Sequence, residues 1–145
     1  MPQPDAFLLD TSAFLALVER EPGRDRVRDL IERAIRGEVL LHACFVSLTE
    51  VRYIVIYKRG PATADETIAE LKALPVRWVH SDDALCAEAA EWKANHKVSF
   101  ADAFVVAAAV RLNANVVHRD PEIVKLGGLI RQEVLPLKTA TPAGF

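Results

Sequence analysis

Short apolar runs alternate along this chain with longer segments of helical periodicity, and this alternation narrows the choice of fold more than any other feature. Buried strands are predicted at 6–9, 39–43, 76–80 and 115–118, with 134–137 as a final strand. One or two predicted helices separate most strands from the next, which requires right-handed crossovers and a parallel sheet with helices on both faces. We therefore predict one three-layer α/β domain, in which helices flank a mostly parallel sheet of four to five strands.

Capping patterns indicate where several of the helices begin. The sequences S-L-T-E at 47–50 and T-A-D-E at 63–66 match the capping box, and S-F-A-D at 99–102 is a similar pattern. Residues 51–57 are rich in β-branched and aromatic side chains, which favour a strand by propensity. The capping box before them and the Gly60–Pro61 stop after them favour a helix, so a helix is predicted there.

Length and composition indicate one folded domain without a large basic surface. The chain has 145 residues, of which 51% are hydrophobic, so it has enough apolar content for a single core and is not a disordered chain. Its 18 Lys and Arg against 20 Asp and Glu give a formal net charge of −2, which argues against tight, non-specific binding to nucleic acid. The domain is expected over residues 1–138, with 139–145 as a frayed tail.

Cysteine spacing and hydropathy exclude several other classes of protein. Cys44 and Cys86 lie in apolar surroundings without C-x-x-C spacing, so both are expected in the core rather than in a redox or zinc motif. An acid, Asp10, interrupts the N-terminal apolar stretch, which has no basic residue before Arg20 and so does not match a signal peptide. The run Phe104–Val110 is too short to span a bilayer. A cytoplasmic protein is expected.

Four acids stand where parallel strands end or where the following helices begin. Asp10 ends the first strand, Glu50 and Asp102 occupy the first turns of their helices, and Asp120 follows the fourth strand. Each has an ordinary alternative role as a helix cap or as a partner of the helix dipole. Ligands of such sheets bind outside the carboxyl ends of the strands, so the four carboxylates are expected at one edge of the sheet.

Carboxylates gathered at one edge need a proton or a cation to offset their repulsion. Two of them held about 4 Å apart repel by about 4 kcal/mol at an effective dielectric of 20. An all-oxygen set favours Mg²⁺ or Mn²⁺, which activates water and neutralises the charge that develops on a phosphodiester. The hydroxyls of Thr11 and Ser12 are placed either to support such a site or simply to cap the helix.

Four motifs then carry a family resemblance. These are L-L-D-T-S-A-F at 8–14, T-E-V-R-Y at 49–53, S-F-A-D-A-F-V-V-A-A-A at 99–109 and V-V-H-R-D-P-E at 116–122. In this order they resemble a PIN domain, over Phe7 to about Leu126, and most of all the small PIN nucleases that are toxins of VapBC-type toxin–antitoxin pairs.

The resemblance implies an endoribonuclease that hydrolyses RNA through a metal-activated water. Asp10, Glu50, Asp102 and Asp120 match the acidic quartet that holds Mg²⁺ or Mn²⁺ in the family, as both catalytic and metal-ligating residues. It also implies two partners besides RNA, a small antitoxin and a second copy of the chain in a homodimer.

Four further residues are expected to be auxiliary. Thr11 or Ser12 matches the hydroxyl that follows the first acid of the family, and Glu122 matches an acid found two places after the last one. His118, followed by Arg119, stands where many members have Thr or Ser. It is expected to orient Asp120 or to contact RNA, although a lone histidine at a strand end more often has a structural role.

Two other functions remain open from the sequence. A phosphoacceptor regulatory module on a flavodoxin-like sheet also gathers acids at strand ends, but it resembles an adjacent acid pair after the first strand, whereas Thr11 and Ser12 follow Asp10 here. The other alternative is a PIN-like scaffold without catalysis.

The net charge of the protein is expected to affect its affinity for RNA. One bound Mg²⁺ would cancel the formal net charge of −2, so the metal-loaded and metal-free forms are expected to differ in affinity for RNA. Six basic residues are candidates for steering RNA toward the site: Arg24, Arg26, Arg28, Arg52, Lys58 and Arg59.

Overall fold

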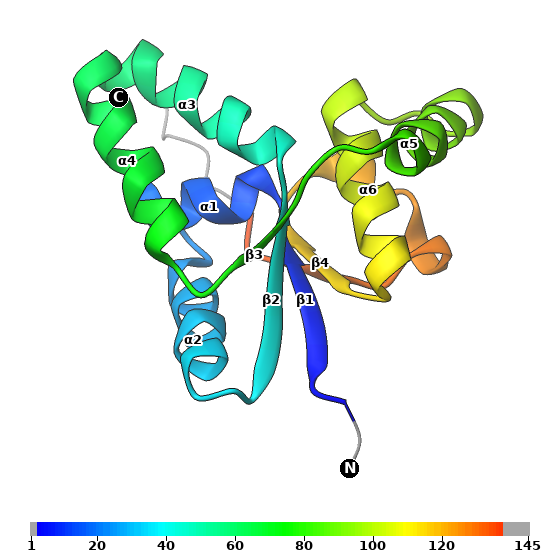
Figure 1. Ribbon diagram of the computed structural model, residues 1–145, viewed down its shortest axis with the longest axis horizontal. Helices are drawn as coiled ribbons and strands as arrows, with labels where there is room; N and C mark the ends of the chain where they lie inside the picture. The colour runs from blue at the N-terminus through cyan, green and yellow to red at the C-terminus, as the bar shows by residue number, and fades with distance from the viewer. Residues whose placement is uncertain (1–2, 138–145) are drawn as a thin grey trace.

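The computed structural model describes residues 3–137 and contains one parallel sheet of five strands (Figure 1). In spatial order the strands are β3, β2, β1, β4 and β5, and every neighbouring pair runs parallel. The strands are β1 (Asp5–Leu9), β2 (Val39–Cys44), β3 (Arg77–Val79), β4 (Asn115–His118) and β5 (Gln132–Val134). The predicted α/β class is confirmed, and the order differs from the 2-1-3-4-5 order of flavodoxin-like sheets.

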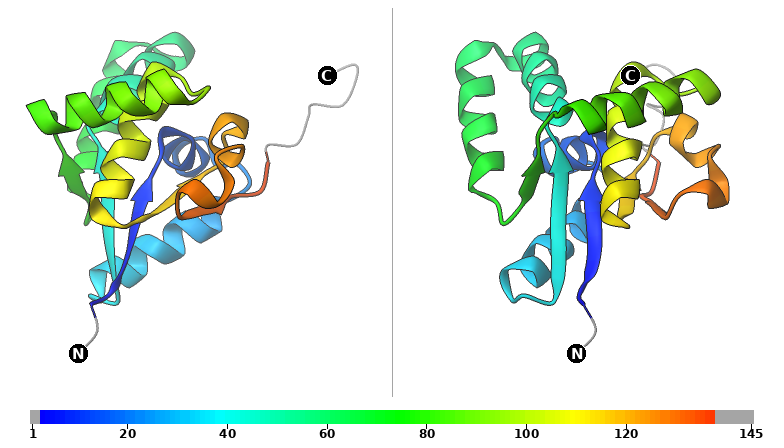
Figure 2. Two further views of the ribbon diagram at one scale, coloured as in Figure 1. Left: turned by 90° about the vertical axis from the view of Figure 1, so that its right-hand side faces the viewer. Right: turned by 45° about the vertical axis from the view of Figure 1, so that its right-hand side comes forward.

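Helices cover both faces of this sheet, which gives the three predicted layers (Figures 1 and 2). Helices α1 to α4 lie against one face, and α5, α6 and α7 lie against the other. Within the described residues the seven helices are α1 (Thr11–Val18), α2 (Arg24–Ile35), α3 (Val46–Arg59), α4 (Pro61–Ala73), α5 (Asp83–Asn95), α6 (Phe100–Leu112) and α7 (Pro121–Val124). A short 3₁₀ turn, η1 (Gly127–Leu129), precedes β5.

The core is divided by the sheet into two apolar clusters. Along β1 the side chains alternate, so Phe7 and Leu9 join the cluster under α1 to α4, while Leu8 joins the cluster under α5 to α7. Helix α6 is the most deeply buried, because its residues 102–109 are all buried. Its first turn therefore contains the buried residues Asp102 and Ala103, while Phe100 stays exposed.

Strand β1 lies at the centre of the sheet, and the chain crosses from it in both directions. The β1–β2 connection leads to one side and the β1–β4 pairing lies on the other, so the carboxyl ends of β1 and β4 form the point where the order reverses. Asp10 follows β1 directly, and Asp120 stands two residues after β4. This topology brings two acids 110 positions apart to one edge of the sheet.

Residues 51–57 lie in helix α3, as predicted, although their β-branched and aromatic side chains favour a strand. Ser47, Val51 and Val55 recur every four residues and are all buried, so the helical spacing places one face of the segment in the core. The predicted capping box is wrong, because Phe45 is the N-cap and Ser47 lies inside the helix with its hydroxyl directed to Thr11.

Three further boundaries differ from the predictions. Helix α4 begins at Pro61 after Gly60, which has φ +87°, so the proposed box at 63–66 does not start it. The last strand is Gln132–Val134 rather than 134–137, because an edge strand with polar side chains lacks the apolar signal of a buried one. Cys86 is exposed on α5 instead of buried, whereas Cys44 lies in the core, where burial raises the pKa of its thiol to about 11.

Among the described residues, no helix combines the length and apolar character needed to cross a membrane. The expected frayed tail at 139–145 lies outside those residues.

Candidate metal centre

Asp10 is a buried N-cap with one carboxylate oxygen to spare. Its Oδ2 accepts hydrogen bonds from the Ser12 amide at 3.2 Å and the Ser12 hydroxyl at 2.7 Å, which caps α1. Its Oδ1 is buried and has no hydrogen-bond partner. The side chain is almost inaccessible to water, and this burial raises the pKa of Asp10 against the opposing effect of Ser12. An orphaned oxygen of this kind needs a proton or a cation.

Asp102 lies in the first turn of α6, opposite Asp120. Ser99 is the N-cap of this helix, and its Oγ accepts from the Asp102 amide at 3.1 Å. In a capping box the acid would accept in return from the Ser99 amide, but that amide donates to Glu122 Oε2 at 3.0 Å. Burial first, and then a hydrogen bond with Asp120, raise the pKa of Asp102 to about 8.

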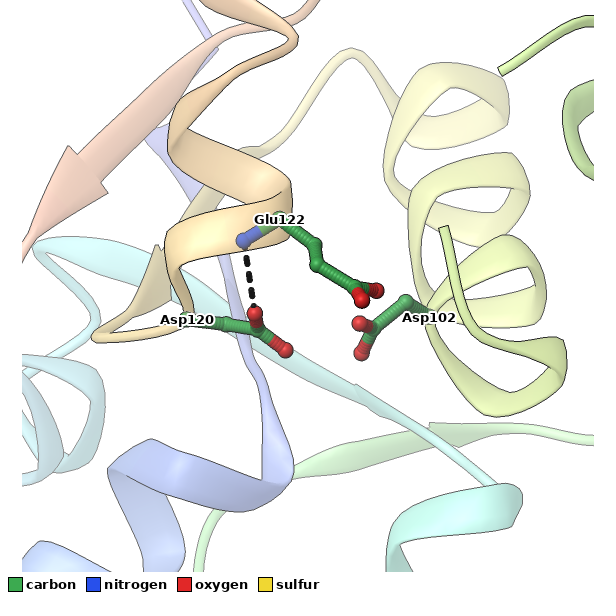
Figure 3. A group of neighbouring side chains, drawn as sticks. All are labelled: Asp102, Asp120 and Glu122. Carbon is green, nitrogen blue, oxygen red and sulfur yellow. Dashed lines mark hydrogen bonds between the residues drawn. The ribbon is translucent and has the colours of Figure 1, made fainter. Parts of the chain in front are cut away.

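The loop after β4 supplies two more carboxylates to the same place. Asp120 caps α7, because its Oδ1 accepts from the Glu122 amide at 2.9 Å. Figure 3 shows the side chains of Asp102 and Glu122 pointing toward each other from α6 and α7, with Asp120 beside them. One carboxylate oxygen from each of these three residues lies within 4.8 Å of the other two. We call Asp102, Asp120 and Glu122 the acidic cluster.

Glu50 reaches this edge of the sheet from α3 but stands apart from the acidic cluster. Its Oε1 accepts from the Thr11 hydroxyl at 2.7 Å, and the Thr11 and Ser47 hydroxyl oxygens lie 2.9 Å apart. Burial raises the pKa of Glu50, and the charges of Asp10 and Asp120 act in the same direction. The hydroxyl of Thr11 therefore connects the first turn of α1 to α3.

The segment 118–120 ties the acidic residues together through its backbone. The Asp120 amide donates to Nδ1 of His118 at 3.0 Å, and the Arg119 amide donates to the Ser12 hydroxyl at 3.0 Å. His118 is completely buried, so it has no surface for contact with RNA. The Arg119 guanidinium pairs with Glu21 at 2.6 Å.

The predicted site residues therefore meet at one edge of the sheet, but not as a symmetric quartet. Asp102 and Asp120 lie together, and Glu122, expected only as an auxiliary residue, lies with them. Asp10 and Glu50 are close enough for charge repulsion within the group to raise their pKa values. The sequence reasoning overlooked Ser99 as a structural partner of Glu122 and Gln132 as a partner of His118. The contact between Gln132 and His118 could have been predicted only if the polar pair Gln132–Glu133 had been assigned to a strand.

This arrangement fits a hard divalent cation. The donors are all carboxylate oxygens, the buried Oδ1 of Asp10 lacks a partner, and burial raises the pKa of Asp102 to about 8, so a nearby positive charge would stabilise its ionised form. Among the described residues, this is the only group of three or more acidic, histidine or cysteine side chains close enough to hold a metal.

The basic residues named as RNA-steering candidates are partly engaged in ion pairs. Arg26 pairs with Glu133 and Asp29, Arg52 with Asp65, and Arg59 with Glu19. Half of the six candidates are thus partly neutralised by neighbouring acids.

The PIN domain family model matches residues 7–129. No curated protein matches the chain by sequence at a significant level.

Several solved structures share the fold. The chain is similar to a chain of VapBC2 from Rickettsia felis, bound to a DNA fragment from its promoter, with a TM-score of 0.73, 12% identity and coverage of 90% of this chain and 99% of the other. DNA-bound VapBC from Salmonella typhimurium gives 0.70 at 17% identity, covering 90% and 98%. VapC20 of Mycobacterium tuberculosis, a toxin that cleaves the sarcin–ricin loop, gives 0.67 at 22% identity, covering 84% and 95%. At these identities the likeness concerns the fold alone.

Proposed function

This chain belongs to the PIN domain family, and from that premise we propose that it is a metal-dependent endoribonuclease, the toxin of a VapBC-type toxin–antitoxin pair. The observation that carries the proposal is the convergence of carboxylates from four elements far apart in sequence, of which Asp10 and Asp102 are buried and Glu50, Asp120 and Glu122 are half-buried. Buried carboxylates at ordinary caps have hydrogen-bond partners, whereas here Asp10 Oδ1 has none and Asp102 keeps a proton to about pH 8. These carboxylates destabilise the folded protein unless a cation binds them.

We assign Asp102 and Asp120 as the central metal ligands, with Asp10, Glu50 and Glu122 around them. Mg²⁺ or Mn²⁺ bound there would activate water and neutralise the charge that develops on the phosphodiester. Ser12 holds one oxygen of Asp10, and the other, which is buried without a partner, would be available to an ion. Thr11 holds Glu50, and the Ser99 amide holds Glu122, so each flexible glutamate is fixed at the rim of the site.

The partners follow from the same proposal. The similar structures from Rickettsia felis and Salmonella typhimurium are of VapBC, and VapC20 is a toxin that cleaves the sarcin–ricin loop. We propose that this chain likewise binds a small antitoxin, acts on RNA in the cytoplasm and forms a homodimer.

Cleavage of a single-stranded RNA tests this function. The wild-type protein should cleave the RNA with Mn²⁺ and not with EDTA, because the carboxylates alone supply no cation. Asp10→Asn and Asp102→Asn should each reduce the rate at least about 100-fold, since each removes a ligand charge from a preorganised site.

Asp83→Asn is the matched control, because Asp83 is an exposed acid in the first turn of α5 outside the acidic cluster. It should cleave at the wild-type rate. Cleavage that survives both Asp10→Asn and Asp102→Asn would refute the proposed mechanism, and no cleavage by a wild-type protein that binds Mn²⁺ would favour the non-catalytic scaffold.

A further inference from the structure

Gln132, the first residue of the edge strand β5, makes two hydrogen bonds that connect this strand to the acidic cluster. Its Oε1 lies 2.8 Å from Nε2 of His118, and its Nε2 donates to the Gly127 carbonyl at 3.0 Å. His118 in turn accepts from the Asp120 amide through Nδ1 at 3.0 Å. A chain of hydrogen bonds thus runs from η1 through Gln132 and His118 to Asp120.

The two backbone groups at the ends of this series of hydrogen bonds, the Gly127 carbonyl and the Asp120 amide, fix the position of every proton in it. A backbone carbonyl can only accept, so the Gln132 amide nitrogen must face Gly127 and its oxygen must face His118. A backbone amide can only donate, so Nδ1 of His118 must be unprotonated where it meets the Asp120 amide. The ring proton therefore lies on Nε2 and is donated to Gln132 Oε1.

Because His118 is buried, the position of its ring proton affects the neighbouring residue Asp120. His118 is inaccessible to solvent, so water is not available to replace a lost partner. The other neutral tautomer would place an Nδ1–H against the Asp120 N–H, two donors facing each other at 3.0 Å. Asp120 would then have to move, and its carboxylate is the one that lies beside Asp102 and accepts from the Glu122 amide.

We propose that Gln132 is a positioning residue of the metal centre: by holding the proton of His118 on Nε2, it fixes the backbone of Asp120 and so the acidic cluster. The role in metal binding rests on the proposed function. Losing a hydrogen-bond partner of a metal ligand changes the affinity of a site by about 10–100-fold. Because Gln132 acts on Asp120 through His118, we expect an effect at the lower end of this range.

The tautomer of His118 is measured directly by ¹⁵N NMR of the imidazole in the metal-free protein at pH 8.5. The wild-type protein should show the Nε2–H form. Gln132→Met, which is similar in shape but offers no comparable acceptor, should lose that single form and bind Mn²⁺ about tenfold more weakly in calorimetry.

Glu133→Gln is the matched control, because Glu133 is the next residue of β5 and pairs with Arg26 instead of His118. It should leave both the tautomer and the Mn²⁺ affinity unchanged. An Nδ1–H form in the wild-type protein, or unchanged Mn²⁺ affinity in Gln132→Met with an altered tautomer, would overturn the relay. A wild-type protein that binds no Mn²⁺ would instead overturn the proposed function, while the tautomer still reports on the hydrogen-bond chain.

Discussion

Single carboxylates in this chain cap helices and can also serve the proposed metal centre. Asp10 caps α1 through Oδ2 and Asp120 caps α7 through Oδ1, so the capping roles that the sequence offered for them are real. The capping bonds leave the second oxygen of each residue available, and in Asp10 that oxygen is buried without a partner. Capping and metal binding are therefore not alternatives here, because the two oxygens of one carboxylate can serve both.

The protonation of Asp102 predicts how the stability of the metal-free protein depends on pH. Its pKa rises from 3.8 in the unfolded chain to about 8 in the folded protein, so between these values the folded state holds a proton that the unfolded state releases. The free energy of unfolding should therefore fall as pH rises toward 8 and level off above it.

Urea unfolding of the wild-type protein and Asp102→Asn at pH 6.0 and 8.5, in EDTA, measures this contribution. The free energy of unfolding of Asp102→Asn relative to wild type should be higher at pH 8.5 than at pH 6.0 by about 1–3 kcal/mol, because the amide has no proton to lose. A difference that is the same at both pH values would mean that Asp102 titrates normally.

At the scale of elements, caps decide whether the first turn of a helix can hold a site. Ser99 caps α6, and its backbone amide also holds Glu122, so one residue sets both the helix start and the rim of the acidic cluster. The sequence predicted α6 with its cap correctly, because the serine precedes a long apolar run. It misplaced the caps of α3 and α4, because the same S/T-x-x-E pattern also occurs inside helices, where tertiary contacts such as that of Ser47 with Thr11 decide.

The difference between a real and an apparent cap can be measured. Ser99→Ala should lower the free energy of unfolding by about 1 kcal/mol, because the Asp102 amide loses its acceptor. Thr63→Ala should change it by less than about 0.5 kcal/mol, since Thr63 lies inside α4 and Gly60 is the N-cap. Equal losses in urea unfolding would show that both threonine and serine act as caps.

At the scale of the whole molecule, the parallel sheet assembles residues that are distant in sequence. The alternation of strands and helices was sufficient to predict that Asp10, Asp102 and Asp120 face one edge, because carboxyl ends of parallel strands meet there. It could not predict that Glu122 would join the acidic cluster while Glu50 remains with Thr11, because those positions depend on side-chain hydrogen bonds between elements. Gln132 was missed for the same reason, since its partner lies on another strand.

Metal binding should therefore stabilise the fold as a whole. At Mn²⁺ concentrations about 100-fold above Kd, binding adds about 2.7 kcal/mol to the free energy of unfolding, which corresponds to a rise in Tm of roughly 5–10 °C for a domain of this size. Asp102→Asn should show little of this rise. A similar rise in both proteins, seen by differential scanning fluorimetry, would place the binding of Mn²⁺ elsewhere.

The convergence of these carboxylates on one divalent cation is tested most directly by calorimetric titration of the metal-free protein with Mn²⁺ at pH 7, repeated in buffers of different ionisation enthalpy. The wild-type protein should show saturable binding that releases protons, because Asp102, with a pKa of about 8, must ionise when the ion binds. Asp102→Asn should bind at least about tenfold more weakly and release fewer protons. Equal affinity in the two proteins, or no saturable binding by the wild type, would contradict a metal centre at this edge of the sheet.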